Sequence, residues 1–446
     1  MAQVILPAPL KRLTGGNGEI AVAGATAGEV LQRLEELHPG IRGWVLDERG
    51  RLRRHVNVFV GDRRADLQTP VGAEDPLHVL QAISGGSPGG DLTEVLVGTK
   101  KGLFILRGRR GGTPEVGPRH FPGQVVEFAV RDPRSGTYMA SVTHGQFGPR
   151  IFFADDHDGE WRQAEGPSFP EDAGAAVERI WAIEPGEEEG VLWAGVAPAA
   201  LFVSTDHGRS WSLNRGLWDV PSRPQWEGGL GGLALHSICP WPGDPERLAV
   251  GISAAGVWIT EDGGSSWRRG GRGLVPRYLP EEAREEALML CVHNMRRAHR
   301  EPRTLYMQFH GGVYRSDDEG DTWNDISGNR RLPADFGFPI AVDPDDPNRA
   351  FVIPLTSDGD RVTHEGRLRV YETRDRGESW QALTSGLPQR DAHLTVLRQA
   401  FHQDGRRPLG LYFGATSGEL FGSADGGASW TTLARRLPPV LSVRAS

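Results

Sequence analysis

The chain has 446 residues, of which 38% are hydrophobic and 24% charged, values ordinary for a soluble globular protein of about two to four domains. The net charge of −8 is spread along the sequence and no run approaches 18 apolar residues, which argues against nucleic acid as a partner and against a membrane span. Without a signal-peptide layout, and with only Cys239 and Cys291, the chain is expected to be cytoplasmic and to lack a disulfide framework.

The first 86 residues predict a small α+β domain. Thr26 and Glu29 fit a capping box, and apolar residues then recur at helical spacing until Pro39 and Gly40 end the helix. Strand-like runs flank this helix at residues 18–24, 55–67 and 76–86. One helix across a sheet of four or five strands is the outline of a β-grasp, or ubiquitin-like, fold.

Residues 1–86 resemble the MoaD/ThiS family of sulfur-carrier proteins. The resemblance lies in "VNVFVGD" at 56–62, in "VGAEDPLHVL" at 71–80 and in the Gly85-Gly86 pair. It implies that an activating enzyme adenylates the terminal glycine carboxylate, which is then converted to a sulfur-donating thiocarboxylate. Two glycines suit this role because, without Cβ atoms, they pass through a narrow active site.

The chain departs from that family because Gly86 is not its end. One interpretation is that residues 87–91 ("SPGGD") continue a flexible linker between two domains. The other is that the carrier is made as a precursor, which a protease of the deubiquitinase type cuts after Gly86. Small, exposed, polar segments of this kind are where proteolysis concentrates.

A second pattern fills residues 92–446. The phrase Ser/Thr-x-Asp-x-Gly-x-x-Trp occurs five times at a period of 50–57 residues, which indicates propeller blades or an array. A worn sixth copy holds Asp156 and Trp161. The Asp and Trp pairs of the five complete copies are Asp206 and Trp211, Asp262 and Trp267, Asp318 and Trp323, Asp375 and Trp380, and Asp425 and Trp430.

This phrase resembles the Asp box of the sialidase and BNR-repeat propellers. Its Asp and Ser/Thr side chains can tie a turn by bonding nearby backbone N–H groups, so we assign the boxes a structural role. Each repeat holds four strand-like runs, one propeller blade. The run at 94–98 has no inner strand before it, and the run at 440–445 has nothing after it. Pairing these two runs would close a seven-bladed β-propeller.

A propeller gathers ligands at the centre of one face, at the starts of the inner strands and the turns between second and third strands. Candidate catalytic residues there are Glu178, Arg179, His236, His293, Arg398 and Arg444. Candidate binding residues are Lys100, His144, Gln146, Trp181, His310 and Arg361, with Asp358 on the same turn as Arg361. The four histidines could hold a metal ion or could be hydrogen-bonded blade residues.

Two further sets of residues have alternative interpretations. Glu127 and Glu178 could be the paired carboxylates of a glycosidase. Cys239 and Cys291, on neighbouring inner strands, are interpreted as buried, inert thiols. The stretch "KGLFILRG" at 101–108 is not the Phe-Arg-Ile-Pro stretch of sialidases, which puts sialidase chemistry in doubt.

The propeller also resembles a bacterial group of BNR-like propellers labelled glycosyl hydrolase, through "VLVGTKKGLF", "GISAAGVW", "DFGFPI" and "LPPVLSVRA". The leading hypothesis is a sulfur carrier fused to a propeller that binds a glycan or a protein. The alternatives are a glycoside hydrolase with an appended ubiquitin-like domain, and a fused scaffold whose diglycine is vestigial.

Overall fold

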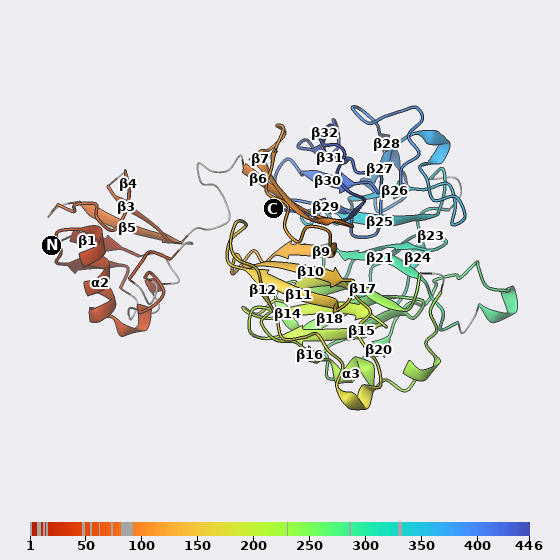
Figure 1. Cartoon of the computed structure of the whole chain (residues 1–446), viewed down its shortest axis with the longest axis horizontal. Coiled ribbons are helices and arrows are strands. Elements are labelled where there is room, and N and C mark those ends of the chain that lie inside the picture. The colour runs from red at the N-terminus through yellow and green to blue at the C-terminus, as the bar shows by residue number, and fades with distance from the viewer. Residues whose placement is uncertain are drawn as a thin grey trace. The chain divides into compact units, whose positions relative to one another are not determined.

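A computed structural model describes the chain except for residues 1, 7–9, 12–13, 15–16, 47–49, 54–55, 62, 73–74, 82–91, 230, 285–286 and 329–331. The chain divides into two compact units, Met1–Asp91 and Leu92–Ser446 (Figure 1). Gly85 and Gly86, on which the carrier and processing predictions depend, lie outside the described residues, as does the segment 87–91.

The N-terminal unit is a five-stranded sheet with one long helix. The strands are β1 (Ala2–Ile5), β2 (Glu19–Val22), β3 (Val56–Val60), β4 (Arg63–Ala65) and β5 (Pro76–Gln81), in the order β2-β1-β5-β3-β4. The helices whose bounds fall within its described residues are α2 (Ala27–Leu37) and the short η1 (Pro39–Ile41). Strands β1 and β5 are parallel and the other neighbours antiparallel, as in a β-grasp sheet. Sequence analysis missed β1, which is only four residues long.

Helix α2 starts and packs as its sequence predicts. The Thr26 hydroxyl accepts a hydrogen bond from the Glu29 N–H at 3.3 Å, while the Glu29 carboxylate accepts one from the Ala25 N–H at 2.8 Å. Of the apolar stripe, Val30, Leu31 and Leu34 are fully buried against the sheet, whereas Leu37 at the end of the helix is 59% exposed. This unit therefore has a hydrophobic core of its own.

The second unit is built from four-stranded antiparallel sheets, and the described residues hold seven of them. The first joins β33 (Val440–Ala445), β6 (Leu92–Thr99), β7 (Gly102–Arg109) and β8 (Glu115–Val116). The second joins β9 (Val125–Arg131), β10 (Tyr138–His144), β11 (Gly148–Ala154) and β12 (Arg162–Gln163). The third joins β13 (Arg179–Pro185), β14 (Leu192–Ala197), β15 (Ala200–Ser204) and β16 (Ser212–Leu213).

The remaining sheets follow the same plan. The fourth joins β17 (Ala234–Trp241), β18 (Asp244–Ser253), β19 (Gly256–Thr260) and β20 (Arg268–Arg269). The fifth joins β21 (Val292–Arg297), β22 (Leu305–Phe309), β23 (Gly312–Ser316) and β24 (Asn324–Asp325). The sixth joins β25 (Gly337–Val342), β26 (Ala350–Pro354), β27 (Val370–Thr373) and β28 (Gln381–Leu383). The last joins β29 (Phe401–Gln403), β30 (Leu411–Gly414), β31 (Leu420–Ser423) and β32 (Thr431–Ala434).

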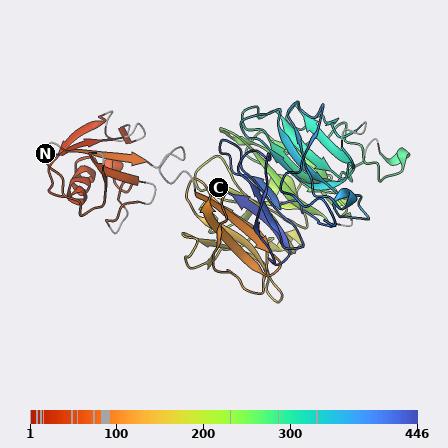
Figure 2. The same cartoon turned by 90° about the horizontal axis from the view of Figure 1, so that it is seen from above.

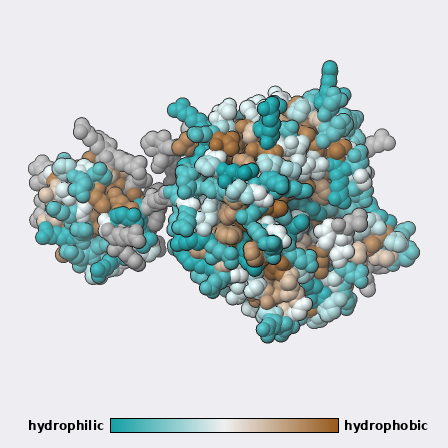
Figure 3. All heavy atoms as spheres, viewed as in Figure 1, coloured by the Kyte–Doolittle hydropathy of each residue, from teal (hydrophilic) through white to brown (hydrophobic). Residues whose placement is uncertain are grey.

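Short helices interrupt the connections between these strands. They are η2 (Glu171–Ala173), α3 (Arg215–Trp218), η3 (Arg223–Gln225), η4 (Glu281–Ala283) and η5 (His364–Gly366). No described helix is long and apolar enough to cross a membrane. Hydrophilic residues cover most of the visible face of each unit (Figure 3).

The inner strand of each sheet, its first strand, contacts the inner strands of the two neighbouring sheets, so the sheets close into a propeller. The last contact in the circle is made by β33 with β29. The C-terminal strand β33 pairs with β6, with Val443 opposite Val97, and Figure 2 shows the blue end of the chain beside the orange strands. The predicted pairing of 440–445 with 94–98 is confirmed, because Val440 to Ala445 lie opposite Thr99 to Val95.

The Asp boxes tie turns, as the sequence predicts. In one box the Ser316 hydroxyl donates to Asp318 at 2.9 Å and accepts from the Gly320 N–H at 2.9 Å. Asp318 also accepts from the Thr322 N–H at 2.8 Å, and the buried Trp323 donates its indole N–H to the Gly320 carbonyl at 2.8 Å. The same Ser/Thr-to-Asp hydrogen bond recurs at Asp206, Asp262, Asp375 and Asp425. The tryptophans are less uniform, because the Trp380 indole donates to the Ile326 carbonyl at 2.9 Å and the buried indole N–H of Trp430 makes no hydrogen bond among the described residues.

We predict that removing residues 440–446 lowers the melting temperature of the propeller sharply. The deletion exposes the edge of β6 and the apolar surface that covers Val440 and Val443. Both valines are fully buried, and burial of each side chain stabilises the fold by about 1.5–3 kcal/mol. Val443→Ala, which keeps the strand, should have a smaller effect. Thermal unfolding measures the melting temperatures of both variants. A truncated chain with the same melting temperature as the full chain would contradict the closure of the ring.

Acid should weaken the Asp boxes. Hydrogen bonds from Ser266 and Thr260 lower the pKa of Asp262 to about 2. Because this folded-state pKa lies below the unfolded value of about 3.9, the stabilisation is complete above about pH 4 and is lost as the pH falls through about 2. Urea unfolding across this range should show a shallower loss for Asp262→Asn, which has no carboxylate to protonate. Equal pH dependence of the two chains would refute the role given to Asp262.

Candidate functional site

A β-bulge recurs at the start of the inner strands. In six sheets the inner strand holds one more residue than its partner, so that one residue has no partner in the register. The inserted residues are Glu127, Trp181, His236, His293 and Leu441, and one of Phe338 and Pro339. Bulges re-aim side chains, and repetition gives these residues equivalent positions around the ring.

Neighbouring bulge residues meet one another. The ring of Trp181 lies edge-on to His236 with centroids 6.2 Å apart, and His293 lies 5.0 Å from Phe338. Arg398, just before β29, bridges these two groups: its guanidinium lies 5.8 Å from the Trp181 ring and 4.8 Å from the Phe338 ring. Residues from the third, fourth, fifth, sixth and last sheets therefore form one continuous site.

Arg398 is the unsatisfied group of this site. Its Nε is buried and makes no hydrogen bond within the described part of the chain. The pKa of Arg398 is lowered to about 10, chiefly by burial and also by Arg361 and Arg179, while Cys291 acts to raise it. Arg361 also lies over the Phe338 ring, at 5.6 Å. The site thus presents a group of cations to an incoming ligand.

One carboxylate faces part of this charge. Glu127 lies 3.1 Å from the Nε of Arg179, whose guanidinium lies 4.8 Å from the Trp181 ring. Burial raises the pKa of Glu127, and Arg179 and Lys100 lower it. Glu178 is exposed, as are Lys100 and Arg179. Glu127 therefore acts first as the counter-ion of Arg179.

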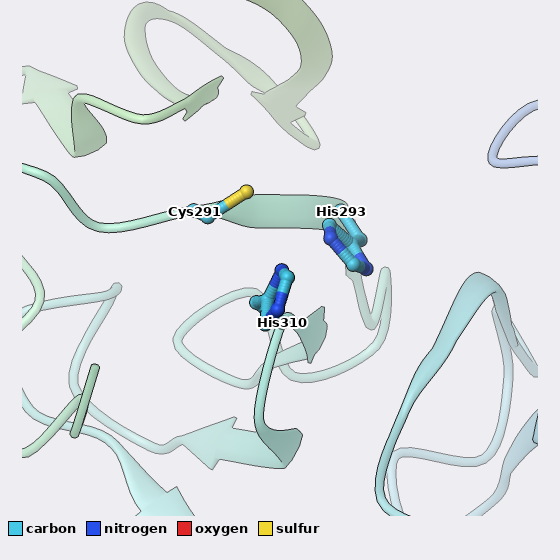
Figure 4. Close-up of side chains that lie close together, drawn as sticks. All are labelled: Cys291, His293 and His310. Carbon is cyan, nitrogen blue, oxygen red and sulfur yellow. The ribbon is translucent and has the colours of Figure 1, made fainter. Parts of the chain in front are cut away.

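A thiol and two imidazoles lie together at the start of β21 (Figure 4). Cys291 directly precedes β21, His293 is its bulge residue, and His310 lies in the turn that joins β22 to β23. One potential ligand atom from each lies within 4.8 Å of the others. The aromatic rings of Tyr278 and Phe336 flank His310 at 4.8 and 5.3 Å.

A hydrogen bond orients His293, and a carboxylate faces His310. The Nδ1 of His293 lies 2.6 Å from the Gly337 carbonyl oxygen, and the Nε2 of His310 lies 3.6 Å from Asp358 Oδ2. Burial lowers the pKa of His293 well below its usual range and lowers that of His310, an effect that Asp358 opposes. The two rings are neutral bases at neutral pH.

The other predicted site residues lie in different surroundings. His236 uses both ring nitrogens, on the Val292 carbonyl at 3.0 Å and on the Ser237 hydroxyl at 3.2 Å, which fits a structural residue. His144 stacks on Phe147 with centroids 4.8 Å apart, beside the exposed Gln146. Of the four predicted histidines, His293 and His310 form a pair, His236 contacts Trp181 in the same site with both its nitrogens engaged, and His144 packs against Phe147 instead.

Arg444 belongs to a buried network. It bonds Glu184 at 3.1 Å and Gln399 at 2.8 Å, and it lies 4.2 Å from the Phe128 ring. With its partners supplied by the propeller itself, Arg444 holds β33 in place.

The two cysteines differ. Cys239 is buried, donates to the Met295 carbonyl at 3.3 Å, and has its pKa raised by burial to about 11, which fits the inert thiol that the sequence predicts. Cys291 is partly exposed and lies in the site, 3.6 Å from the Ser253 hydroxyl. The signal that sequence analysis missed is Cys-x-His at 291–293 at the start of an inner strand.

Comparison with known proteins assigns each unit separately. A family model for the BNR/Asp-box repeat matches residues 202–213, which hold Asp206 and Trp211. The sulfur carrier protein CysO of Mycobacterium tuberculosis is 33% identical over 89 residues, which are 19% of this chain and 96% of CysO. Through its N-terminal unit, the chain belongs to the CysO family of sulfur carriers. This match confirms the predicted resemblance of the N-terminal unit to sulfur carriers.

The propeller has more distant relatives. An oligoxyloglucan-reducing end-specific xyloglucanase of Emericella nidulans is 26% identical over 221 residues, 43% of this chain. The chain spans only 25% of the length of that enzyme. The crystal structure of an ancestral GH74 enzyme aligns over 72% of this chain and 38% of its own, with 17% identity and a TM-score of 0.47. The chain therefore matches these propeller enzymes over only part of their length.

We predict that Cys291 reacts with a thiol reagent in the folded chain much faster than Cys239, because Cys239 is buried and its thiol holds its proton. Counting modified thiols should give one fast site in the wild type and in Cys239→Ala, and none in Cys291→Ser. Unfolding in urea should expose the second. Equal reactivity of the two thiols would contradict the placement of Cys291 in an accessible site.

Proposed function

We propose that the chain is the precursor of a sulfur carrier, released by cleavage after Gly86, and that the propeller is its ligand- or partner-binding module. The observation that carries this proposal is the match of 89 residues to 96% of a sulfur carrier that is complete at that length. The β-grasp sheet and separate core of the N-terminal unit support it.

The chemistry of a carrier requires the cut. Adenylation needs a free carboxylate, and in the intact chain the Gly86 carbonyl belongs to the peptide bond with Ser87. Hydrolysis would leave a carboxylate on Gly86 and an amine on Ser87. An activating enzyme could then transfer AMP from ATP to this carboxylate, with release of pyrophosphate, and a sulfide donor would displace AMP from the acyl adenylate to give the thiocarboxylate. The partners proposed for this unit are therefore an adenylating enzyme and a protease, acting in the cytoplasm.

The propeller would bind its ligand at the centre of the ring. We count it as seven-bladed, one blade for each four-stranded sheet. Arg398, Arg361, Arg179 and Lys100 outnumber the carboxylates Glu127 and Asp358 there, so a group with negative charge on a glycan or a protein fits this site. The rings of Trp181 and Phe338 offer apolar surface beside that charge.

A glycoside hydrolase is the second function, favoured by the xyloglucanase relative and by the burial of Glu127. A general acid needs a raised pKa and a second carboxylate about 5–9.5 Å away. The proximity of Arg179 to Glu127 opposes the protonated state that an acid requires. Release of reducing sugar from xyloglucan oligosaccharides, lost in Glu127→Gln, would favour the hydrolase.

We predict that the native host contains a fragment ending at Gly86, part of it heavier by the replacement of one carboxylate oxygen with sulfur. Gly86→Val should leave only the full chain, because a side chain at this position obstructs both the protease and the activating enzyme. Gly90→Val is the matched control and should be cut normally. Intact-mass measurement of chains recovered from the host decides the matter. Wild-type extracts that hold only full-length chain would overturn the precursor.

A further inference from the structure

We propose that Cys291, His293 and His310 bind a zinc ion and leave one coordination position open to an outside ligand. This site lies within the propeller and does not depend on cleavage after Gly86 or on sulfur transfer.

The ligand set is the first reason. One thiolate and two imidazoles are the N and S donors that zinc prefers, and three protein ligands with an open position are typical of zinc sites that bind or activate a further molecule. The carboxylate and carbonyl oxygens that magnesium and calcium require do not form part of this cluster as described.

The backbone places the three ligands together. The bulge at His293 and the residue before β21 lie beside the turn after β22, and the backbone N–H of His310 donates to the Cys291 carbonyl at 3.1 Å. This bond fixes the two ligand-bearing segments against each other. Zinc bonds of about 2.0–2.1 Å to nitrogen and 2.3 Å to sulfur put the ligand atoms of a tetrahedral site about 3.3–3.6 Å apart. In the structure these atoms lie within 4.8 Å of one another, so binding zinc requires the three side chains to rotate closer together.

Second partners leave one nitrogen of each imidazole for the metal. The Gly337 carbonyl can only accept, so the Nδ1 of His293 donates and its Nε2 carries a free lone pair. Asp358, 3.6 Å from the Nε2 of His310, favours the proton on that nitrogen and leaves Nδ1. A carbonyl or carboxylate behind each ligating histidine is the usual arrangement at zinc sites.

Arg398 lies beside this cluster. Its guanidinium lies 4.8 Å from the Phe338 ring, which packs 5.0 Å from the His293 ring, and its buried Nε lacks a hydrogen-bond partner among the described residues. This cation would favour an anion in the open coordination position.

The test is zinc binding by the full chain without a polyhistidine tag. After removal of metal with a chelator, addition of zinc and desalting, we expect one zinc per chain by elemental analysis in the wild type. His144→Ala and Cys239→Ala are matched controls, a second funnel histidine and the other cysteine, and should retain it. Cys291→Ser and His310→Ala should lose it, and Asp358→Asn should weaken binding about tenfold. Magnesium at the same concentration should not be retained.

Cobalt gives an answer that does not depend on the folding of the ligand variants. Wild type and Cys239→Ala loaded with cobalt should show the near-ultraviolet charge-transfer absorption of a thiolate bound to cobalt. Absence of this band in both chains, absence of retained zinc in the wild type, or equal retention in Cys291→Ser and His310→Ala would each overturn the site.

Discussion

The pairing of the C-terminal strand β33 with β6 closes the ring on which the rest of the propeller depends. Sheets of four strands leave edges and apolar faces that only neighbouring sheets can cover. Closure across β33 and β6 brings the last sheet back to the first, and Arg444 is then enclosed by Glu184 and Gln399 from other sheets. Because the inner strands contact each other around the whole circle, their starting residues are held at one centre.

The centre gains its chemistry from a repeated irregularity. A regular inner strand would alternate its side chains between the two faces of its sheet, but the bulge gives each strand one residue outside that alternation. Glu127, Trp181, His236 and His293 occupy that position in successive sheets. Arg398, next to the inner strand of the last sheet, then lies between Trp181 of the third sheet and Phe338 of the sixth. A structural repeat has in this way placed a carboxylate, an indole and two imidazoles at equivalent positions of one site.

The repeated sheets of the propeller could be predicted from the sequence, whereas the residues that depart from the repeat at the bulges could not. The spacing of the Asp boxes and the unpaired runs at 94–98 and 440–445 predicted the sheets and the closing strand, because hydrogen-bonded turns and strand edges have direct sequence signals. It named His293 and His310, but it grouped them with His144 and interpreted Cys291 as buried. Which side a residue faces at a bulge depends on the partner strand, and single-strand periodicity does not contain that information. The short strand β1 was missed because four residues carry little periodicity.

Diffraction from crystals of the full chain grown with zinc, recorded on both sides of the zinc absorption edge, tests most directly whether the ring gathers one chemical site at its centre. The predicted result is a single strong anomalous peak bounded by the sulfur of Cys291 and by one nitrogen each of His293 and His310. Peaks confined to surface histidines such as His144, with these three side chains turned apart, would contradict it.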